Sequence, residues 1–309
     1  MSFLEVEKYK SLDFFARQVV EGFITGLHKS PFHGFSVEFA EHRLYNTGES
    51  TKNIDWKLYG RTDKLFVKRF EEETNLRCQI LIDQSSSMLF PLEKHGIFET
   101  PNKLTFAVYA SALLVELLVR QRDAFGLTLF SDSIDLQTEV RSSTMHQRHI
   151  YSLLEQLLKP VEIDDTNRRG TTIAETLHLL AEKMHRRSLV VLFTDAFVRQ
   201  GEQEQLLDAL RHLRHCKHEV LLFHTFDWDK EIELDYDNKP YFFIDMETGR
   251  RLKVFPHEIA EKYRLAMERQ TNDVKRHAMQ YHIDYIPVDI NKGFDQVMLP
   301  YILKRAKHY

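Results

Sequence analysis

Residues 77–83 read RCQILID, an apolar run of strand length that ends in an acidic residue. Similar apolar runs follow at residues 125–130 (FGLTLF), 188–194 (SLVVLFT) and 219–226 (EVLLFHTF). Strands that are apolar on both faces and alternate with helices form parallel sheets that helices cover on both sides. The sequence therefore predicts an α/β fold with an open, mostly parallel, Rossmann-like sheet.

Segments of helical character separate these runs. The expected helices span residues 13–27, 102–120, 146–158, 172–185, 203–215, 256–280 and 293–306. A hairpin is expected at residues 232–254, with its turn at Glu247–Gly249, and a strand at residues 283–288 should join the same sheet.

The chain is expected to divide near residue 75. Residues 1–75 are predicted to hold an N-terminal helix and a small β-containing segment, in which Phe35, Val37 and Phe39 alternate with polar residues as in a strand. Residues 76–309 are predicted to form the α/β domain, with the hairpin as an insertion.

Composition narrows the class of protein. Of the 309 residues, 43% are hydrophobic and 28% charged, which is typical of a globular protein. A net charge of −4 offers no basic footprint for nucleic acid. No stretch has the apolar character of a signal peptide or a membrane span. Two cysteines, Cys78 and Cys216, favour reduced thiols, so a cytoplasmic protein is expected.

Three oxygen-rich loops follow predicted strands or open a predicted helix. They carry Asp83 with Ser85 and Ser87, then Thr171, and then Asp195. Each loop alone is also compatible with an ordinary turn or helix cap. Because ligands of open parallel sheets bind outside the carboxyl ends of the strands, we expect these side chains to meet at one edge.

Carboxylate and hydroxyl oxygens suit a hard cation, so Mg²⁺ is expected, with Mn²⁺ or Ca²⁺ as alternatives. Asp83, Ser85, Ser87 and Thr171 would bind the ion, and Asp195 would hold a coordinated water. With only two carboxylates the ion keeps excess positive charge. An open coordination position would then attract an acidic residue of a partner protein.

The same residues resemble the metal-ion-dependent adhesion site (MIDAS) of von Willebrand factor A-like, or integrin I-like, domains. Residues 123–132 (DAFGLTLFSD) also resemble the second-strand segment of those domains, often written DRVGLVLFSD. Two departures are present. Arg169 stands where the family often has a glycine, and Ala196 follows Asp195 where the family usually has glycine. Thr172 remains an alternative ligand to Thr171.

The upstream segment and the tail resemble the domain of unknown function 58 proteins. The matching residues are Gly26, His28, Ser30, Gly34, Glu38, Phe39, Arg43, Tyr45, Gly48, Glu49, Ile54, Asp55, Trp56, Lys57, Val67, Lys68, Glu72 and residues 243–249. Many members carry two membrane helices ahead of this region. The resemblance implies a non-catalytic adaptor that works with a MoxR-type AAA+ ATPase. The segment from Gly48 to Lys57 is interpreted either as a partner-contacting loop or as a local anchor through Trp56.

Three other functions remain open. A metal-dependent phosphoester hydrolase is one, although Ser85 occupies the position at which haloacid-dehalogenase-type phosphatases have a second aspartate. A structural domain with a vestigial metal site is another. The third is a zinc site, whose ligands would be His212, His215, Cys216 and His218.

Overall fold

The computed structural model describes residues 11–28, 42–44, 56–68, 76–92, 102–159, 173–196 and 203–306. By their contacts, residues up to Gly22 group with Leu76–Tyr309 as one compact unit, and Phe23–Asn75 form a second. The predicted segment 1–75 therefore contributes to both units. The larger unit contains β3 (Arg77–Asp83), η3 (Ser86–Leu89), α3 (Lys103–Arg120), β4 (Ala124–Phe130), β5 (Ile134–Gln137), α4 (Thr144–Leu157), α5 (Ile173–Lys183), β6 (Leu189–Thr194), α6 (Gln203–His215), β7 (Glu219–Phe226), η4 (Trp228–Ile232), β8 (Tyr241–Ile244), β9 (Arg251–Val254), α7 (Pro256–Gln280), β10 (Asp284–Asp289) and α8 (Asp295–Ala306).

A six-stranded sheet lies at the centre of this unit, in the order β10-β7-β6-β3-β4-β5. All neighbouring strands in it are parallel except β4 and β5. The four predicted apolar runs form β3, β4, β6 and β7, and the predicted late strand joins the sheet as β10. The prediction of an open, mostly parallel sheet is confirmed.

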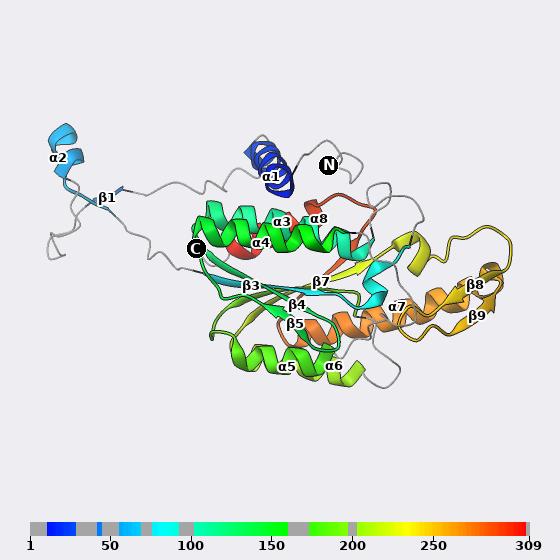
Figure 1. Cartoon of the computed structure of the whole chain (residues 1–309). Helices are drawn as coiled ribbons and strands as arrows, with labels where there is room; N and C mark the ends of the chain where they lie inside the picture. Colours follow the sequence, from blue (N-terminus) through cyan, green and yellow to red (C-terminus); the bar gives the residue numbers. More distant parts are fainter. Residues whose placement is uncertain are drawn as a thin grey trace. The chain divides into compact units, whose positions relative to one another are not determined.

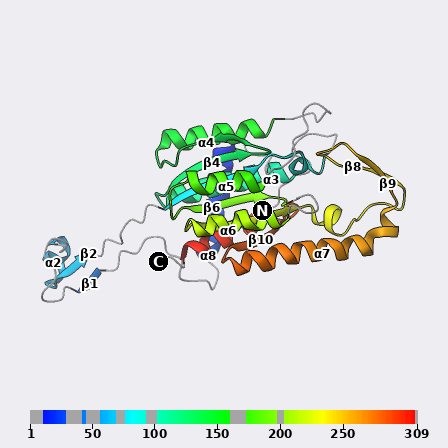
Figure 2. The ribbon, with the colours of Figure 1, turned by 90° about the horizontal axis from the view of Figure 1, so that it is seen from below.

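Helices cover both faces of the sheet (Figure 1). The helices α3, α4 and α8 lie over one face, and α5, α6 and α7 lie over the other, as the view from below also shows (Figure 2). Buried side chains of α5 and α6, such as Leu177 and Leu210, share one core cluster with Leu81 and Leu192 of the sheet. Parallel strands need this double cover because both of their faces are apolar.

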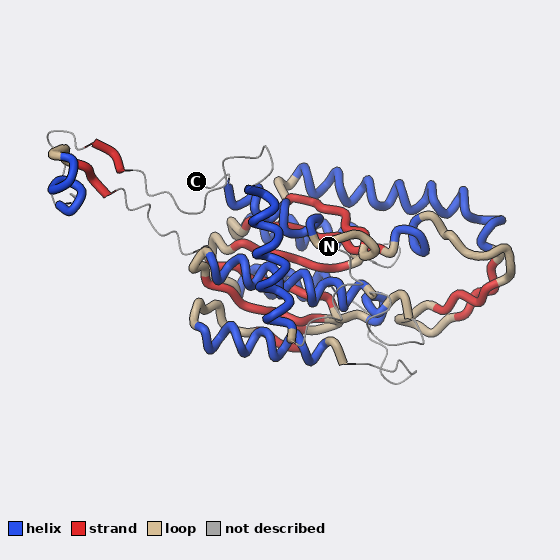
Figure 3. Tube along the Cα trace, turned by 90° about the horizontal axis from the view of Figure 1, so that it is seen from above, coloured by secondary structure: helices blue, strands red, loops and turns tan. Residues whose placement is uncertain are grey.

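The first helix, α1 (Leu12–His28), adds a further layer outside α3 and α8 through its N-terminal half. Phe15 is almost fully buried, and its ring meets Tyr109 of α3 edge-on at a centroid distance of 5.0 Å. Phe294, just before α8, lies 5.9 Å from Phe15. Because α1 covers its outer side, α3 is buried at nearly every position. Figure 3 shows the helices of this face from above.

The second unit contains α2 (Trp56–Thr62) and a two-stranded antiparallel pair of β1 (His42–Leu44) and β2 (Phe66–Lys68). The strand predicted around Phe35 to Phe39 lies outside the described residues. So does most of the segment from Gly48 to Lys57, and its two interpretations remain predictions.

Two features of the larger unit differ from expectation. The antiparallel edge strand β5 was not predicted, because four residues of mixed polarity (IDLQ) give no periodic signal of useful length. The expected hairpin is shorter than predicted: β8 and β9 pair within it, while the preceding turn η4 is helical. None of the helices in the described ranges combines the length and apolar character needed to cross a membrane.

Candidate functional site

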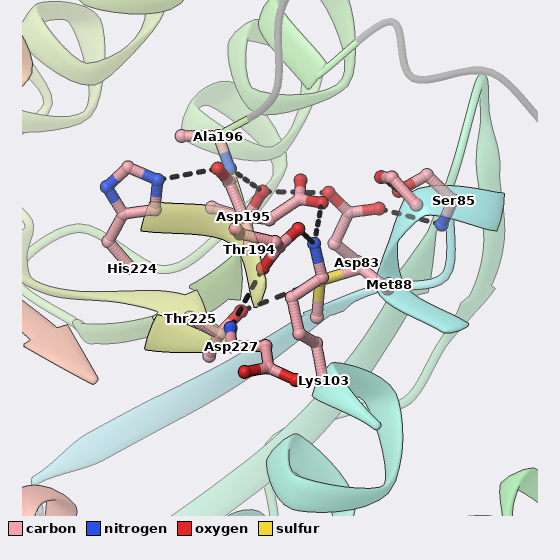
Figure 4. A network of polar contacts seen from close by, with 12 residues as sticks. Asp83, Ser85, Met88, Lys103, Thr194, Asp195, Ala196, His224, Thr225 and Asp227 are labelled. Carbon is pink, nitrogen blue, oxygen red and sulfur yellow. Dashed lines mark hydrogen bonds and ion pairs between the residues drawn. The ribbon is translucent and has the colours of Figure 1, made fainter. Parts of the chain in front are cut away.

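Asp83 ends β3 and is completely buried. Its Oδ1 accepts a hydrogen bond from the backbone N–H of Ser85 at 2.8 Å, and its Oδ2 accepts one from the hydroxyl of Thr194 at 2.8 Å. Thr194 ends β6, the parallel neighbour of β3. Since parallel strands end at the same edge of a sheet, the two side chains meet there, as Figure 4 shows.

The loop after Asp83 carries the two predicted serines. The Oγ atoms of Ser85 and Ser87 lie 3.0 Å apart, and Ser85 is fully buried. The short helix η3 begins directly after Ser85, so the chain turns tightly enough to hold both hydroxyls beside the end of β3. Asp83, Ser85 and Ser87 therefore form a compact group of oxygen donors.

Asp195, the residue after β6, is buried at the same edge and is paired with a lysine. Its Oδ2 accepts a hydrogen bond from Lys103 Nζ at 2.8 Å. The same ammonium group donates to Glu231 Oε1 at 2.6 Å. Lys103 is 1% exposed, so this cation is almost completely removed from water. Its two hydrogen bonds link Asp195 to the η4 turn.

Burial and charge oppose each other at Lys103. Burial by itself lowers the pKa of the ammonium group, but the carboxylates of Asp195 and Glu231 outweigh it and raise the pKa above its ordinary value. Lys103 is therefore a permanent positive charge beside the loop. Its position in the first turn of α3 is fixed by Asn102, whose side chain accepts the N–H of Thr105 in a capping box.

Asp83 lacks such a cation among the described residues. Burial raises its pKa to about 7, and the nearby charge of Asp195 adds to the rise. The hydrogen bonds from Ser85 and Thr194 act in the opposite direction but do not restore the ordinary value. The ionised form of Asp83 is thus destabilised, as expected for a carboxylate that lacks a positive partner.

His224 of β7 lies against the backbone of Asp195 on the inner side of the site. Its Nε2 contacts the backbone oxygen of Asp195, and its Nδ1 lies 2.8 Å from the hydroxyl of Tyr285. Burial lowers the pKa of His224 to about 4, so the ring is neutral at pH 7. A carbonyl oxygen only accepts, so Nε2 carries the proton and Nδ1 accepts from Tyr285. The ring fixes the backbone of Asp195.

A cavity of about 20 Å³ borders this inner side, between Asp195, His224, Glu231 and Tyr263 of α7. That volume is about the size needed for one water molecule. Tyr263, Met267, Gln270 and Thr271 of α7 line this side of the site.

The remaining predicted ligand, Thr171, lies outside the described residues, and so does its alternative Thr172. Lys103, Glu231 and His224 were not predicted as parts of the site, and Thr194, noted beside Asp195 at the strand end, was given no role in it. The sequence held only one signal for Thr194, its position at the end of an apolar strand. Lys103 opens a helix, where a lysine is ordinarily solvated, so nothing local marks it as buried.

The zinc hypothesis receives no support from the histidines. His212 Nδ1 lies 2.9 Å from Nδ1 of His178 on α5, and the buried His218 contacts the backbone oxygen of Ala181. Within the described residues, no group of three or more His, Cys, Asp or Glu side chains is placed to hold a metal ion. The candidate site at the end of β3 differs from such a zinc site, because it combines two carboxylates with several hydroxyls.

The profile of the family described as "Protein of unknown function DUF58" matches residues 41–277. The chain belongs to the DUF58 family. The match includes Asp83, Lys103, Asp195 and Glu231, so the whole candidate site lies in the DUF58 region.

Three curated proteins that match the chain are distant relatives. Uncharacterized proteins of Mycobacterium bovis and Mycobacterium tuberculosis are 23% identical to this DUF58 chain over 241 residues, which cover 78% of the chain and 70% of each relative.

Among solved structures, the conserved hypothetical protein BatB from Bacteroides thetaiotaomicron is 16% identical, with a TM-score of 0.46, and covers 76% of this chain and 100% of its own. An aerotolerance-related membrane protein from Bacteroides fragilis is 19% identical, with a TM-score of 0.45 and coverages of 74% and 99%. Likenesses this distant support no statement about function.

Proposed function

We propose that this DUF58 protein is a non-catalytic, divalent-cation-dependent adaptor that binds a partner protein through a von Willebrand factor A-like domain. The ion is Mg²⁺, with Mn²⁺ or Ca²⁺ as alternatives. In this proposal Asp83, Ser85, Ser87 and Thr171 bind the ion, and Asp195 supports it through a water molecule.

The charge balance at the end of the sheet carries the proposal. Asp83, Asp195 and Glu231 are three largely buried carboxylates, and Lys103 is the one cation that the described residues place among them. When all four groups are ionised they leave a formal charge of −2. Buried charges of one sign are costly unless they are compensated. A divalent cation beside Asp83 would neutralise this cluster, and by stabilising the ionised carboxylate it would lower the pKa of Asp83, which burial raises.

The donors also fit a hard cation. Asp83 offers a carboxylate, and Ser85 and Ser87 offer two hydroxyls that are already in contact with each other. Asp195 is held by Lys103, so it is better placed to orient a water than to bind the ion directly. The ion, when bound, would offer an open coordination position that a carboxylate of a partner can occupy.

The residue two positions after Asp83 favours a binding role over hydrolysis. Ser85 stands two residues after Asp83, where an aspartyl phosphatase would need an acid to move the proton. Its Oγ lies 3.0 Å from the Oγ of Ser87. If the protein hydrolyses phosphate esters only with Mg²⁺, and Asp83→Ala abolishes this activity, the hydrolase alternative replaces the adaptor proposal.

The resemblance to DUF58 proteins nominates a MoxR-type AAA+ ATPase as the partner. The proposal places both in the cytoplasm, in keeping with Cys78 and Cys216, which are free thiols.

A direct binding assay tests this function. A purified MoxR-type ATPase is passed over immobilised chain in Mg²⁺ or in chelator, with wild type, Asp83→Ala and the control Asp208→Ala, which changes an exposed carboxylate on α6. Retention should require Mg²⁺ and should be lost only in Asp83→Ala. Equal retention in all arms would show that the cation site is not used for binding.

A further inference from the structure

The hairpin of β8 and β9 has an exposed face that carries two apolar and two basic side chains. Phe242 pairs with Lys253 and Ile244 with Arg251, so these four side chains point to one side of the hairpin. All four are exposed: Phe242 is 68% exposed and Ile244 45%. We call this group the outer face of the hairpin.

The opposite side of the hairpin has a partner within the chain. Tyr241 and Phe243 point to that side, and the ring of Tyr236 meets them at centroid distances of 5.1 Å and 5.3 Å. Lys230 Nζ in turn lies over the ring of Tyr236 at 4.9 Å. A two-stranded hairpin is marginal by itself, and these contacts supply the packing it needs. The apolar residues of the outer face point away from Tyr236.

Charge on the outer face is of one sign. Arg251 and Lys253 are its two charged residues, and Lys253 Nζ lies 5.9 Å from the centroid of the Phe242 ring. Asp245, in the turn of the hairpin, accepts hydrogen bonds from the backbone N–H of Glu247 and from the hydroxyl of Thr248. Neither cation pairs with a carboxylate in the part of the chain that the structure describes. Exposed aromatic and aliphatic side chains beside such cations fit a surface that mixes apolar groups with carboxylates.

We propose that the outer face of the β8–β9 hairpin docks an acidic segment of a partner protein, in which apolar side chains lie among carboxylates. Phe242 and Ile244 would contact the apolar side chains, and Arg251 and Lys253 would pair with the carboxylates. This contact does not depend on a bound cation, so it is separate from the function proposed above.

The position of the hairpin is consistent with that role. It projects from the end of the sheet at which β3 and β7 finish (Figure 1). The η4 turn leads into it, and Glu231 of η4 is bonded to Lys103 beside Asp195. A partner docked on the outer face therefore lies at the same end of the domain as Asp83, and it could engage both places.

The test uses the full chain and a defined probe. The probe is a blocked, fluorescent peptide of alternating glutamate and leucine, and a second peptide has glutamine in place of glutamate. Binding is followed by anisotropy with Mg²⁺ and with chelator. The variants are Arg251→Glu/Lys253→Glu and Phe242→Ser/Ile244→Ser. The control is Arg148→Glu/Lys159→Glu, two exposed cations on and just after α4. Circular dichroism verifies folding.

The acidic peptide should bind wild type and the control alike, with or without Mg²⁺. Each hairpin variant should bind the acidic peptide about tenfold or more weakly than wild type does. Wild type should bind the glutamine peptide about tenfold or more weakly than the acidic peptide. Absence of binding to wild type, or equal binding to Arg251→Glu/Lys253→Glu, would overturn the proposal. Self-association of wild type that Phe242→Ser/Ile244→Ser abolishes would also overturn it, since the occupant would then be a second copy of the chain.

Discussion

Lys103 donates a 2.8 Å hydrogen bond to Asp195 across 92 residues of sequence. This bond joins the first turn of α3 to the end of β6, and the same ammonium group reaches Glu231 in η4. One buried cation therefore holds three separate segments together at the edge of the sheet. Its charge offsets part of the negative charge of the cluster but leaves Asp83 uncompensated.

Replacing Lys103 by methionine should destabilise the metal-free protein strongly. The substitution keeps most of the side-chain volume but leaves Asp195 and Glu231 buried without their cation. Loss of one partner from a buried ion pair costs about 3–5 kcal/mol. Urea denaturation in chelator measures this change. The control Lys159→Met, at an exposed position, should remain within about 0.5 kcal/mol of wild type.

The same variant should respond more to a divalent cation than wild type does. Without Lys103 the three carboxylates carry one more uncompensated negative charge, so the site should attract Mg²⁺ more strongly. A ligand that binds only the folded state raises the free energy of unfolding as its affinity rises. The gain in stability on adding Mg²⁺ should be larger for Lys103→Met. An equal gain in both proteins would show that the ion does not bind beside this cluster.

The stability of the metal-free protein should carry a pH signature of Asp83. Its pKa is raised from 3.8 to about 7, so the folded state binds more protons than the unfolded state between those values. The free energy of unfolding therefore falls as pH rises from about 4 to about 7. The expected contribution of this one group is about 3–4 kcal/mol.

His224 acts in the opposite direction over the same range. Its pKa is lowered from 6.5 to about 4, so its contribution to stability is lost as pH falls through that interval. The two effects mask each other in wild type, and the variant Asp83→Asn separates them. Between pH 4 and pH 7 the stability of Asp83→Asn should rise with pH more steeply than that of wild type. Parallel curves from denaturation at several pH values would exclude the raised pKa of Asp83.

Gly126 of β4 should not tolerate a side chain. A Cβ atom there would lie 2.6 Å from Oε1 of Gln79, whose Nε2 donates to Thr128 at 2.8 Å. Gly126→Ala must displace this buried amide, at a cost of about 1–3 kcal/mol. The double variant Gly126→Ala/Gln79→Ala should recover part of the loss. A double-mutant cycle in thermal unfolding measures it, and strictly additive losses would argue against the contact.

The sheet could be predicted because its signal is local. Each of β3, β6 and β7 is a continuous apolar run, and such runs need the cover of helices on both faces. The edge strand β5 could not be predicted, since a short antiparallel strand of mixed polarity depends on its pairing with β4. Asp83, Ser85, Ser87 and Asp195 were placed at one edge because parallel strands end together.

The partners of these residues could not be predicted from the same signals. A lysine at the start of a helix is solvated in most proteins, and only the tertiary structure removes Lys103 from water. Glu231 lies 128 residues from Lys103, in the η4 turn just before the predicted hairpin. Pairings over such separations are set by the packing of the whole domain.

Calorimetric titration of Mg²⁺ into the metal-free chain at pH 8 tests the central claim, because Asp83 is then largely ionised. The account predicts one Mg²⁺ bound per chain by wild type and by Asp208→Ala. Affinity should fall by about tenfold or more in Asp83→Asn, since the carboxylate of Asp83 is the charged ligand of the site. No binding to wild type at millimolar Mg²⁺, or equal binding by Asp83→Asn, would contradict a cation site at the end of β3.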